Sequence, residues 1–330
     1  MKMIALVFIL SASLFSQSEF IKMCVHPTPS QKVTLQALVD QQRMEYGKEA
    51  CEKIENRYIK NYGRSGFLEI LHLGNKNITD ITLLKYFTGI KELDLSDNKI
   101  KDITPIANLT QLKSLEISNN PITDINALEK LIELESLGLY KINVKNKYVL
   151  ASLKALKFLS ISDQTDIFET IGSLNNLETL YINRTDNLNL CDLNSLTSLK
   201  RLSMSANDIS DISCLKSLKN LEYLTLQNNP IDDISVLSNY SKLSSVDLRD
   251  TSIKDIRVLK DLKKIDTVII DDTQVKDASP LSGKYMSIFS AENTPLRWCS
   301  PKTGQEIIDG VSCFEKDGTE KSWFKRMFKL

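Results

Sequence analysis

The chain has 330 residues, of which 42% are hydrophobic and 25% are charged, and its 42 Lys and Arg residues balance its 42 Asp and Glu residues. This composition is typical of a folded chain that buries a sizeable core. A net charge of zero argues against nucleic-acid binding, which needs a clustered excess of cations.

Residues 1–18 have the form of a secretory signal peptide. A short basic start is followed by an apolar run over residues 4–10 and then by small residues through Ser18. The run is shorter than the ~20 apolar residues that a membrane-spanning helix needs. Because Ser16 and Ser18 form a small-x-small pattern, we expect cleavage just before Glu19.

Cys24 raises a competing interpretation of the N-terminus, a bacterial lipoprotein signal. The residue two places before it is Lys22, which puts a charge where that signal needs small residues. We therefore favour cleavage before Glu19 and expect a protein that is secreted, at the cell surface or periplasmic.

Residues 19–66 are predicted to form a helical N-terminal cap. Residues 34–40 and 49–58 have helical spacing and helix-favouring residue types. We expect one or two helices here, which would cover the apolar end of the array that begins at residue 67.

Residues 67–298 contain one short apolar pattern that recurs every 21 or 22 residues. Its clearest copies read LKSLEISNNPITDI from Leu112 and LEYLTLQNNPIDDI from Leu221. The template, L-x-x-L-x-L-x-x-N-x-I-x-D-I-x-x-L-x-x-L-x-x, matches the leucine-rich repeat signature. The eleven copies begin at Leu68, Ile90, Leu112, Leu134, Leu156, Leu177, Leu199, Leu221, Leu243, Ile265 and Met286.

The template predicts an α/β repeat fold. The L-x-L alternation indicates a short strand with both leucines on one face, and the later apolar positions indicate a tight helical or extended return. One copy cannot bury its leucines, whereas stacked copies can. We therefore expect a leucine-rich repeat solenoid, a curved arc with a parallel β-sheet on its concave face.

Two polar positions of the template are predicted to hold the turns. An Asn follows the strand and can bond backbone groups of its own turn and the next one. In four copies this residue is Asn98, Asn120, Asn207 or Asn229. Threonine replaces it in the last three copies, so we expect a looser C-terminal end; these residues are Thr251, Thr273 and Thr294. Aspartates are expected to accept from backbone N–H groups where the return begins; they are Asp80, Asp102, Asp124, Asp211, Asp233, Asp255 and Asp277.

Six cysteines fit an exported chain. We expect disulfides at the two ends of the array, one between Cys24 and Cys51 and one between Cys299 and Cys313. Cys191 and Cys214 lie in adjacent copies, where Cys214 is either a small core residue or half of a third bridge. No C-x-x-C motif or nearby pair of histidines points to a metal site.

Residues 299–330 are predicted to form an irregular C-terminal cap and a basic, apolar tail that begins at Ser322. Such a tail can touch a membrane surface or a partner. It has no long apolar face, so we favour a frayed terminus or a segment that packs on the cap.

The sequence offers no catalytic constellation. It has two histidines, His26 and His72, and no H-E-x-x-H, phosphate-loop or G-x-G-x-x-G motif. We therefore expect a non-enzymatic protein that uses no cofactor or metal and has no small-molecule substrate.

The pleat of the predicted strands turns the positions two, four and six after each first leucine toward the concave face. In the middle copies these positions carry aromatic and Arg side chains, and acidic residues occur on both sides, among them Glu92 and Asp271. Aromatic and Arg residues dominate binding hot spots. We predict that a protein ligand binds Tyr140, Phe158, Tyr181, Arg201, Tyr223 and Arg249.

Copies four to six depart from the template where the aromatic residues occur. The Asn position holds Ile142, Gln164 and Thr185, and the Asp position holds Asn146, Phe168 and Asn189. Such departures often mark function, and they are equally consistent with drift or a change in curvature.

The template, the helical cap and the signal peptide resemble those of the internalin-like class of bacterial leucine-rich repeat proteins, over about residues 67–300. The resemblance implies an exported protein whose concave face binds a host or envelope protein, although no wall-anchoring L-P-x-T-G motif is visible. The leucine-rich regulatory subunit of protein phosphatase 1, which is intracellular, shares the template. The alternative is therefore a regulatory subunit or scaffold that binds an enzyme in the same concavity, and a structural envelope component is a third interpretation.

Overall fold

The computed structural model describes residues 18–60, 69–162, 168–185, 189–284 and 286–296. The expected signal peptide, apart from Ser18, lies outside the described residues. The expected C-terminal cap, its tail, and Cys299 and Cys313 lie outside them as well.

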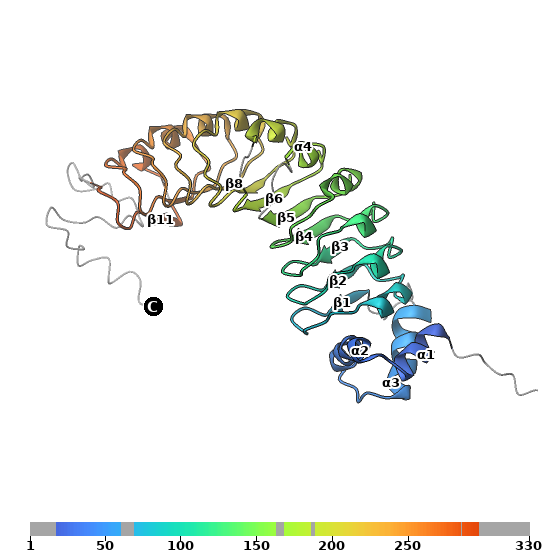
Figure 1. The fold of residues 1–330 in the computed structure, drawn as a ribbon. Helices are drawn as coiled ribbons and strands as arrows, with labels where there is room; N and C mark the ends of the chain where they lie inside the picture. Colours follow the sequence, from blue (N-terminus) through green and yellow to red (C-terminus); the bar gives the residue numbers. More distant parts are fainter. Residues whose placement is uncertain (1–17, 61–68, 163–167, 186–188, 285, 297–330) are drawn as a thin grey trace, which may run out of the picture.

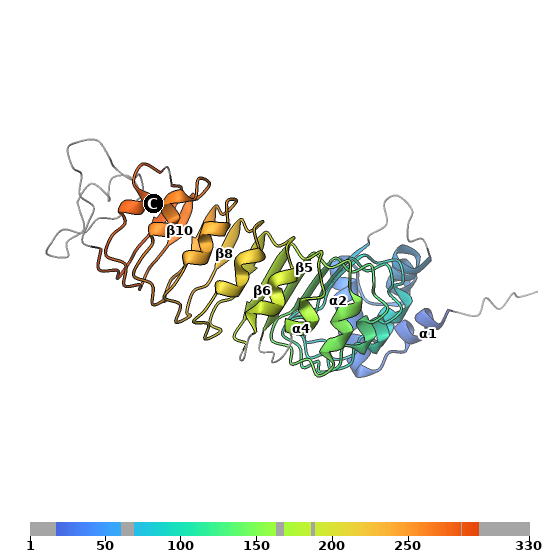
Figure 2. The same cartoon turned by 90° about the horizontal axis from the view of Figure 1, so that it is seen from above.

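Eleven parallel strands form one open sheet in which each strand pairs with its neighbours in sequence. Figure 1 shows them on the inner side of an arc, and Figure 2 shows the coils stacked side by side along it. The predicted solenoid with a concave sheet is therefore confirmed. The strands are β1 (Ile70–His72), β2 (Glu92–Asp94), β3 (Ser114–Glu116), β4 (Ser136–Leu139), β5 (Phe158–Ser162), β6 (Thr179–Asn183), β7 (Arg201–Ser203), β8 (Tyr223–Thr225), β9 (Ser245–Asp247), β10 (Thr267–Ile269) and β11 (Ile288–Ser290).

The return on the outer side of the arc is helical rather than extended. It is the short helix α4 (Phe168–Ile171) in one coil and a 3₁₀ segment in nine others. These segments are η2 (Thr82–Tyr86), η3 (Thr104–Ile106), η4 (Asn126–Leu128), η5 (Lys147–Ser152), η6 (Leu190–Ser195), η7 (Ser213–Ser217), η8 (Ser235–Asn239), η9 (Arg257–Asp261) and η10 (Ser279–Leu281).

The register of the sheet stacks equivalent leucines into one apolar column. Leu71 pairs with Leu93, and Leu93 with Leu115, each at the centre of its strand. Their side chains are at most 2% exposed, and the burial along each strand alternates with the pleat. The column is therefore continuous, and each coil is stabilised by its two neighbours.

Ten of the eleven strands are followed by a described residue in the left-handed conformation, where Asn and Asp are favoured over other non-glycine residues. Ten such residues have φ between 51° and 56°. Seven are Asn or Asp, namely Asn75, Asp97, Asn119, Asn228, Asp250, Asp272 and Asn293, whereas the other three are Lys141, Arg184 and Ala206.

The side chain of the template Asn bonds two coils together. Asn229 donates from Nδ2 to the carbonyl groups of Met204 and Leu226, both at 2.8 Å, and its Oδ1 accepts from the backbone N–H of Ile209 at 3.0 Å. Thr251, one coil later, donates a single bond, to the carbonyl of Leu248 at 2.6 Å. The predicted difference in bonding is present, and the looseness expected from it stays a prediction.

All seven template aspartates accept from the backbone N–H two residues later, at 2.7 to 2.8 Å, as the sequence predicts. Hydrogen bonds from the backbone and then the side chain of Ser213 hold the pKa of Asp211 below its ordinary value. These carboxylates therefore start the return segments.

The N-terminal cap contains three α-helices, one more than predicted. The expected helices correspond to α2 (Pro29–Gln41) and to α3 (Lys48–Ile54) continued by the π-helix η1 (Glu55–Lys60). The additional helix is α1 (Glu19–Val25), whose seven residues are too few for a periodicity to be recognised. None of the described helices is long and apolar enough to cross a membrane.

The cap packs on the first coil through aromatic rings. Phe20 of α1 makes edge-on contacts with Tyr86 and Phe87, with centroids 6.0 and 5.7 Å apart, and Tyr58 lies 5.5 Å from Phe87. Ser18 caps α1 by accepting from the backbone N–H of Ile21 at 3.2 Å, and it donates to the buried carboxylate of Glu55. The described end of the array is thus covered, as the solenoid requires.

Two disulfides lie among the described residues. Cys24 of α1 is bonded to Cys51 of α3, with Cα atoms 5.9 Å apart, which confirms the expected N-terminal bridge. Cys191 is bonded to Cys214 across adjacent coils, with Cα atoms 4.9 Å apart. The third bridge left open by the sequence is therefore present.

Candidate binding surface

The open face of the sheet carries three rows of side chains, one residue of each row per coil. The strand register aligns Phe158, Thr179, Arg201 and Tyr223 in one row, and Ser160, Tyr181 and Ser203 in the next. These positions are half-buried or exposed, whereas the residues between them are buried. Five of the six predicted partner-binding residues therefore lie on β5–β8 and the turn after β4.

Phe158 and Tyr181 form the centre of this surface. Their rings meet edge to face across β5 and β6, with centroids 5.5 Å apart and an interplanar angle of 85°. Such a pair is worth about 0.5–1.5 kcal/mol beyond the area that it buries. The two rings therefore hold each other in place while staying half-open to solvent.

Arg201 and Tyr223 form a second pair on β7 and β8. The guanidinium carbon lies 3.7 Å from the centroid of the tyrosine ring, and the two residues are register partners. Both are exposed, Tyr223 at 37%. The stacked guanidinium keeps donors free for an anionic or carbonyl ligand.

Tyr140 lies between two cations that the sequence did not suggest. Lys141 Nζ and the guanidinium carbon of Arg184 each lie 5.5 Å from its ring centroid, and Arg184 also donates to its hydroxyl. Both cations occupy the left-handed turn position that is Asn or Asp in seven coils. This substitution is the signal in the sequence that could have revealed them.

The middle of the surface has small side chains between the rings. Gly138 of β4 has no side chain, and the carboxylate of Glu116 occupies the place where a Cβ atom would be. Its register partner on β5 is Ser160. A larger residue at position 138 would displace Glu116 and raise the floor of the surface beside Tyr140.

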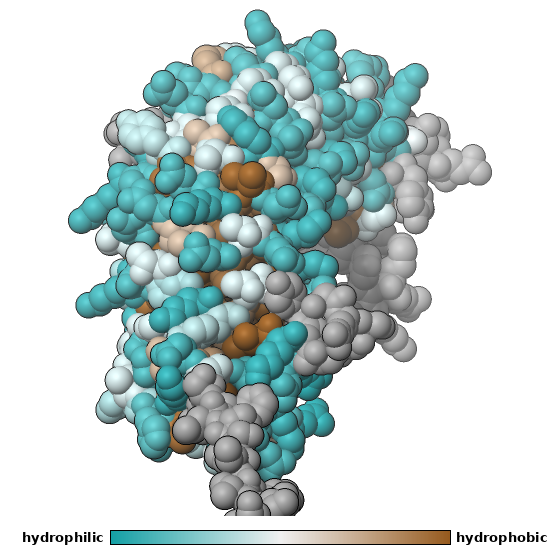
Figure 3. Space-filling model, turned by 90° about the vertical axis from the view of Figure 1, so that its right-hand side faces the viewer, coloured by the Kyte–Doolittle hydropathy of each residue, from teal (hydrophilic) through white to brown (hydrophobic). Residues whose placement is uncertain are grey.

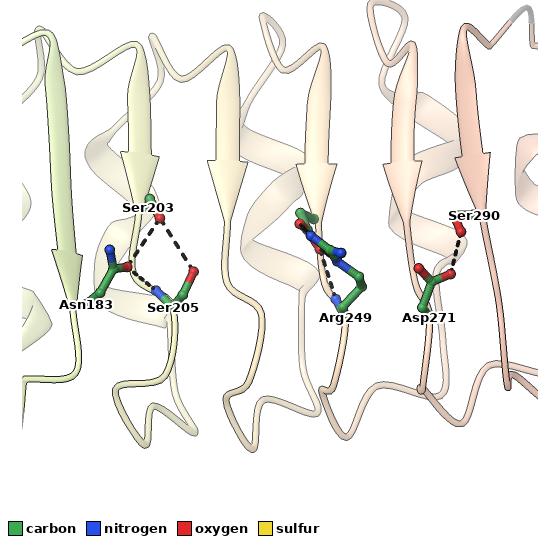
Figure 4. A network of polar contacts seen from close by, with 7 residues as sticks. Asn183, Ser203, Ser205, Arg249, Asp271 and Ser290 are labelled. Atoms are coloured by element: carbon green, nitrogen blue, oxygen red, sulfur yellow. Dashed lines mark hydrogen bonds and ion pairs between the residues drawn. The ribbon is translucent and has the colours of Figure 1, made fainter.

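Arg249 does not join the aromatic residues. It forms a bidentate ion pair with Asp247, with Nη2 to Oδ2 at 2.7 Å and Nε to Oδ1 at 3.0 Å, which raises the pKa of the arginine. Figure 4 shows this pair beside two further networks, Asn183 with Ser203 and Ser205, and Asp271 with Ser290. The ion pair holds Arg249 against Asp247, and the predicted contact of Arg249 with a ligand stays a prediction.

The rest of the described surface is a weaker candidate for a binding site than the concave face. Figure 3 shows the side that faces right in Figure 1, where most side chains are hydrophilic and apolar ones form separate spots. A shallow recess of about 590 Å³ on the outer side is lined by Thr197, Lys216, Ser217, Lys219, Asn220 and Asn239. Within the described ranges, no group of three or more His, Cys, Asp or Glu residues could hold a metal ion.

Comparison with known proteins supports the repeat. A family model described as leucine-rich repeats in two copies matches residues 67–108 and 197–239. No curated protein sequence matches the chain significantly.

Solved structures share the arc. An internalin, inlF, from Listeria monocytogenes superposes with a TM-score of 0.64 at 24% identity, over 83% of this chain and 84% of that one. A leucine-rich repeat protein from Leptospira interrogans gives a TM-score of 0.56 at 21% identity, over 72% of this chain and 68% of that one. The ectodomain of the Arabidopsis receptor kinase HAESA, solved with a peptide hormone, gives a TM-score of 0.57 at 16% identity, over 68% of this chain and 42% of that one. The chain therefore has the leucine-rich repeat fold, and its arc is similar to that of the internalin.

Proposed function

We propose that the protein is an exported, non-enzymatic binding module that holds a protein ligand on its concave face. The observation that carries the proposal is the cluster of rings and cations on β4–β8, directed away from the core. Phe158 with Tyr181 and Arg201 with Tyr223 are ordered by contacts to each other rather than by burial. Exposed aromatic residues arranged in this way are what interface hot spots contain.

The disulfides support export. The bridges Cys24–Cys51 and Cys191–Cys214 would persist in an oxidising compartment and be reduced in most cytosols. They count against the alternative of a cytosolic regulatory subunit. The peptide hormone bound to the HAESA ectodomain supports a protein or peptide as the ligand class.

Site-specific photocrosslinking tests the proposal. A photoreactive phenylalanine analogue replaces Tyr181 on the concave face or, as a matched control, Tyr148 in η5, which is 73% exposed on the outer side. In the cells that make the protein, we expect a discrete protein adduct from position 181 and none from position 148. Adducts from position 148 alone, or none from position 181, would contradict the proposal.

A further inference from the structure

Among the described residues of the concave face, the charges are sorted into three zones along the arc. We define them by the outward positions of each strand and the left-handed turn residue after it. The first acidic zone is Glu92, Asp94, Asp97 and Glu116; the central basic zone is Lys141, Arg184 and Arg201; and the second acidic zone is Asp247, Asp250, Asp271, Asp272 and Glu292. Among these described positions only Arg249 breaks the sorting, and Asp247 neutralises it.

The central zone keeps its charge available. Lys141, Arg184 and Arg201 are exposed, and within the described residues none of them forms an ion pair with a carboxylate. They contact tyrosine rings instead, which orient a cation without neutralising it. A cation prepared in this way is suited to an anionic group of a ligand.

The flanking zones favour the opposite charge. Asp94 and Glu116 accept from serine N–H groups within their own coils, which fixes the carboxylates on the surface while leaving them negative. Asp271 accepts from the hydroxyl of Ser290, one coil later, at 2.6 Å. Like charges facing one another across an interface repel, so these zones would reject an acidic ligand segment.

We infer that the partner presents an acidic centre flanked by basic groups on both sides, an inference that rests on the proposed function. With strands about 4.8 Å apart, Asp94 lies five strands, about 24 Å, from Arg201 on one side, and Asp271 lies three strands, about 14 Å, on the other. The aromatic rings of β5 and β6 lie between the first acidic zone and Arg201 and would supply apolar contact. The chain has no net charge, yet its concave face would select a partner by the order of the charges along it.

Two peptides of identical composition and opposite charge order test the inference. Each has about 16 residues, long enough in extended form to cross the three zones; one has lysines at both ends and aspartates in the middle, and the other the reverse. Fluorescence titration against the full chain in about 10 mM salt keeps screening weak. We expect the peptide with the acidic centre to bind at least about tenfold more tightly.

Charge reversal locates the effect. The variant Arg184→Glu/Arg201→Glu should abolish the preference between the peptides, and the control Lys216→Glu/Lys219→Glu on the outer side should keep it. Equal binding of the two peptides, or a preference that survives reversal of the central zone, would overturn the inference. If the wild type binds the two peptides equally but still gives an adduct at position 181, this inference alone is overturned. If the wild type prefers the peptide with the acidic centre but gives no adduct at position 181, the proposed function is overturned.

Discussion

The guanidinium group of Arg201 stacks on the ring of Tyr223 across β7 and β8, 3.7 Å from its centroid. The contact joins two side chains that have no place in the core, since both lie on the open face of the sheet. An exposed pair of this kind contributes only about 0.5–1 kcal/mol to folding. Its larger effect is to fix both groups in place before a ligand arrives, which lowers the entropic cost of binding.

Adjacent residues of β8 should separate folding from binding. Leu224 is 1% exposed in the apolar column, so Leu224→Ala should lower the free energy of unfolding by about 2–5 kcal/mol. Tyr223→Ala on the opposite face should cost less than about 1 kcal/mol. Urea unfolding followed by circular dichroism measures both, and similar losses for the two variants would show that the Tyr223 ring belongs to the core.

Asn229 should matter more than its counterpart Thr251. Replacing Asn229 with alanine leaves buried N–H and carbonyl groups of two coils without partners, each worth about 1–3 kcal/mol. Thr251→Val removes the single bond to Leu248 and should cost about 0.5–1.5 kcal/mol. We expect urea midpoints to fall much further for the Asn variant; the reverse order would refute the account of the ladder.

Asp211, one of the template aspartates, should make the fold less stable in acid. The pKa of Asp211 is lowered in the folded state, below its ordinary value of 3.8, by hydrogen bonds from Ser213. A lowered pKa stabilises the fold above the unfolded-state value, and this contribution disappears as the pH falls through the folded-state value. The urea midpoint of the wild type should therefore exceed that of Asp211→Asn at neutral pH and approach it below pH 3.8. A difference that does not change with pH would contradict this.

Intact mass tests the N-terminal processing and the bridges together. We expect the mature chain to begin at Glu19, so cleavage would remove Ser18, whose side chain caps α1 and donates to Glu55 in the uncleaved chain. Alkylation before and after reduction should show that the thiols of Cys24, Cys51, Cys191 and Cys214 appear only on reduction. An uncleaved chain, or free thiols at these positions before reduction, would contradict the respective expectation.

The regular part of this fold could be predicted because each coil depends mainly on its neighbours. The spacing of leucines located every strand, and the recurrence of Asn and Asp located the turns that they hold. The prediction failed where a feature is short or pairs distant residues. Helix α1 shows no period in seven residues, and Arg184 reaches Tyr140 across 44 positions of sequence.

The sequence predicted which candidate site residues lie on the open face of the sheet, but it did not predict the contacts between them. The pleat alone placed Phe158, Tyr181, Arg201 and Tyr223 on the open face. Which rings and cations meet depends on side-chain rotamers in neighbouring coils, and a template does not specify them. For the same reason Arg249, predicted to contact the ligand, proved to be held by Asp247.

The most direct test of the concave binding surface is the dissociation constant of the protein that crosslinks at position 181. Isothermal titration calorimetry compares the wild type with Phe158→Ala/Tyr181→Ala and with Tyr148→Ala as the control. If the two rings are the centre of the interface, the dissociation constant of the double variant should rise at least about 30-fold, with a melting temperature lowered by only a few degrees and no effect of the control. A double variant that folds normally and binds as tightly as the wild type would contradict the account.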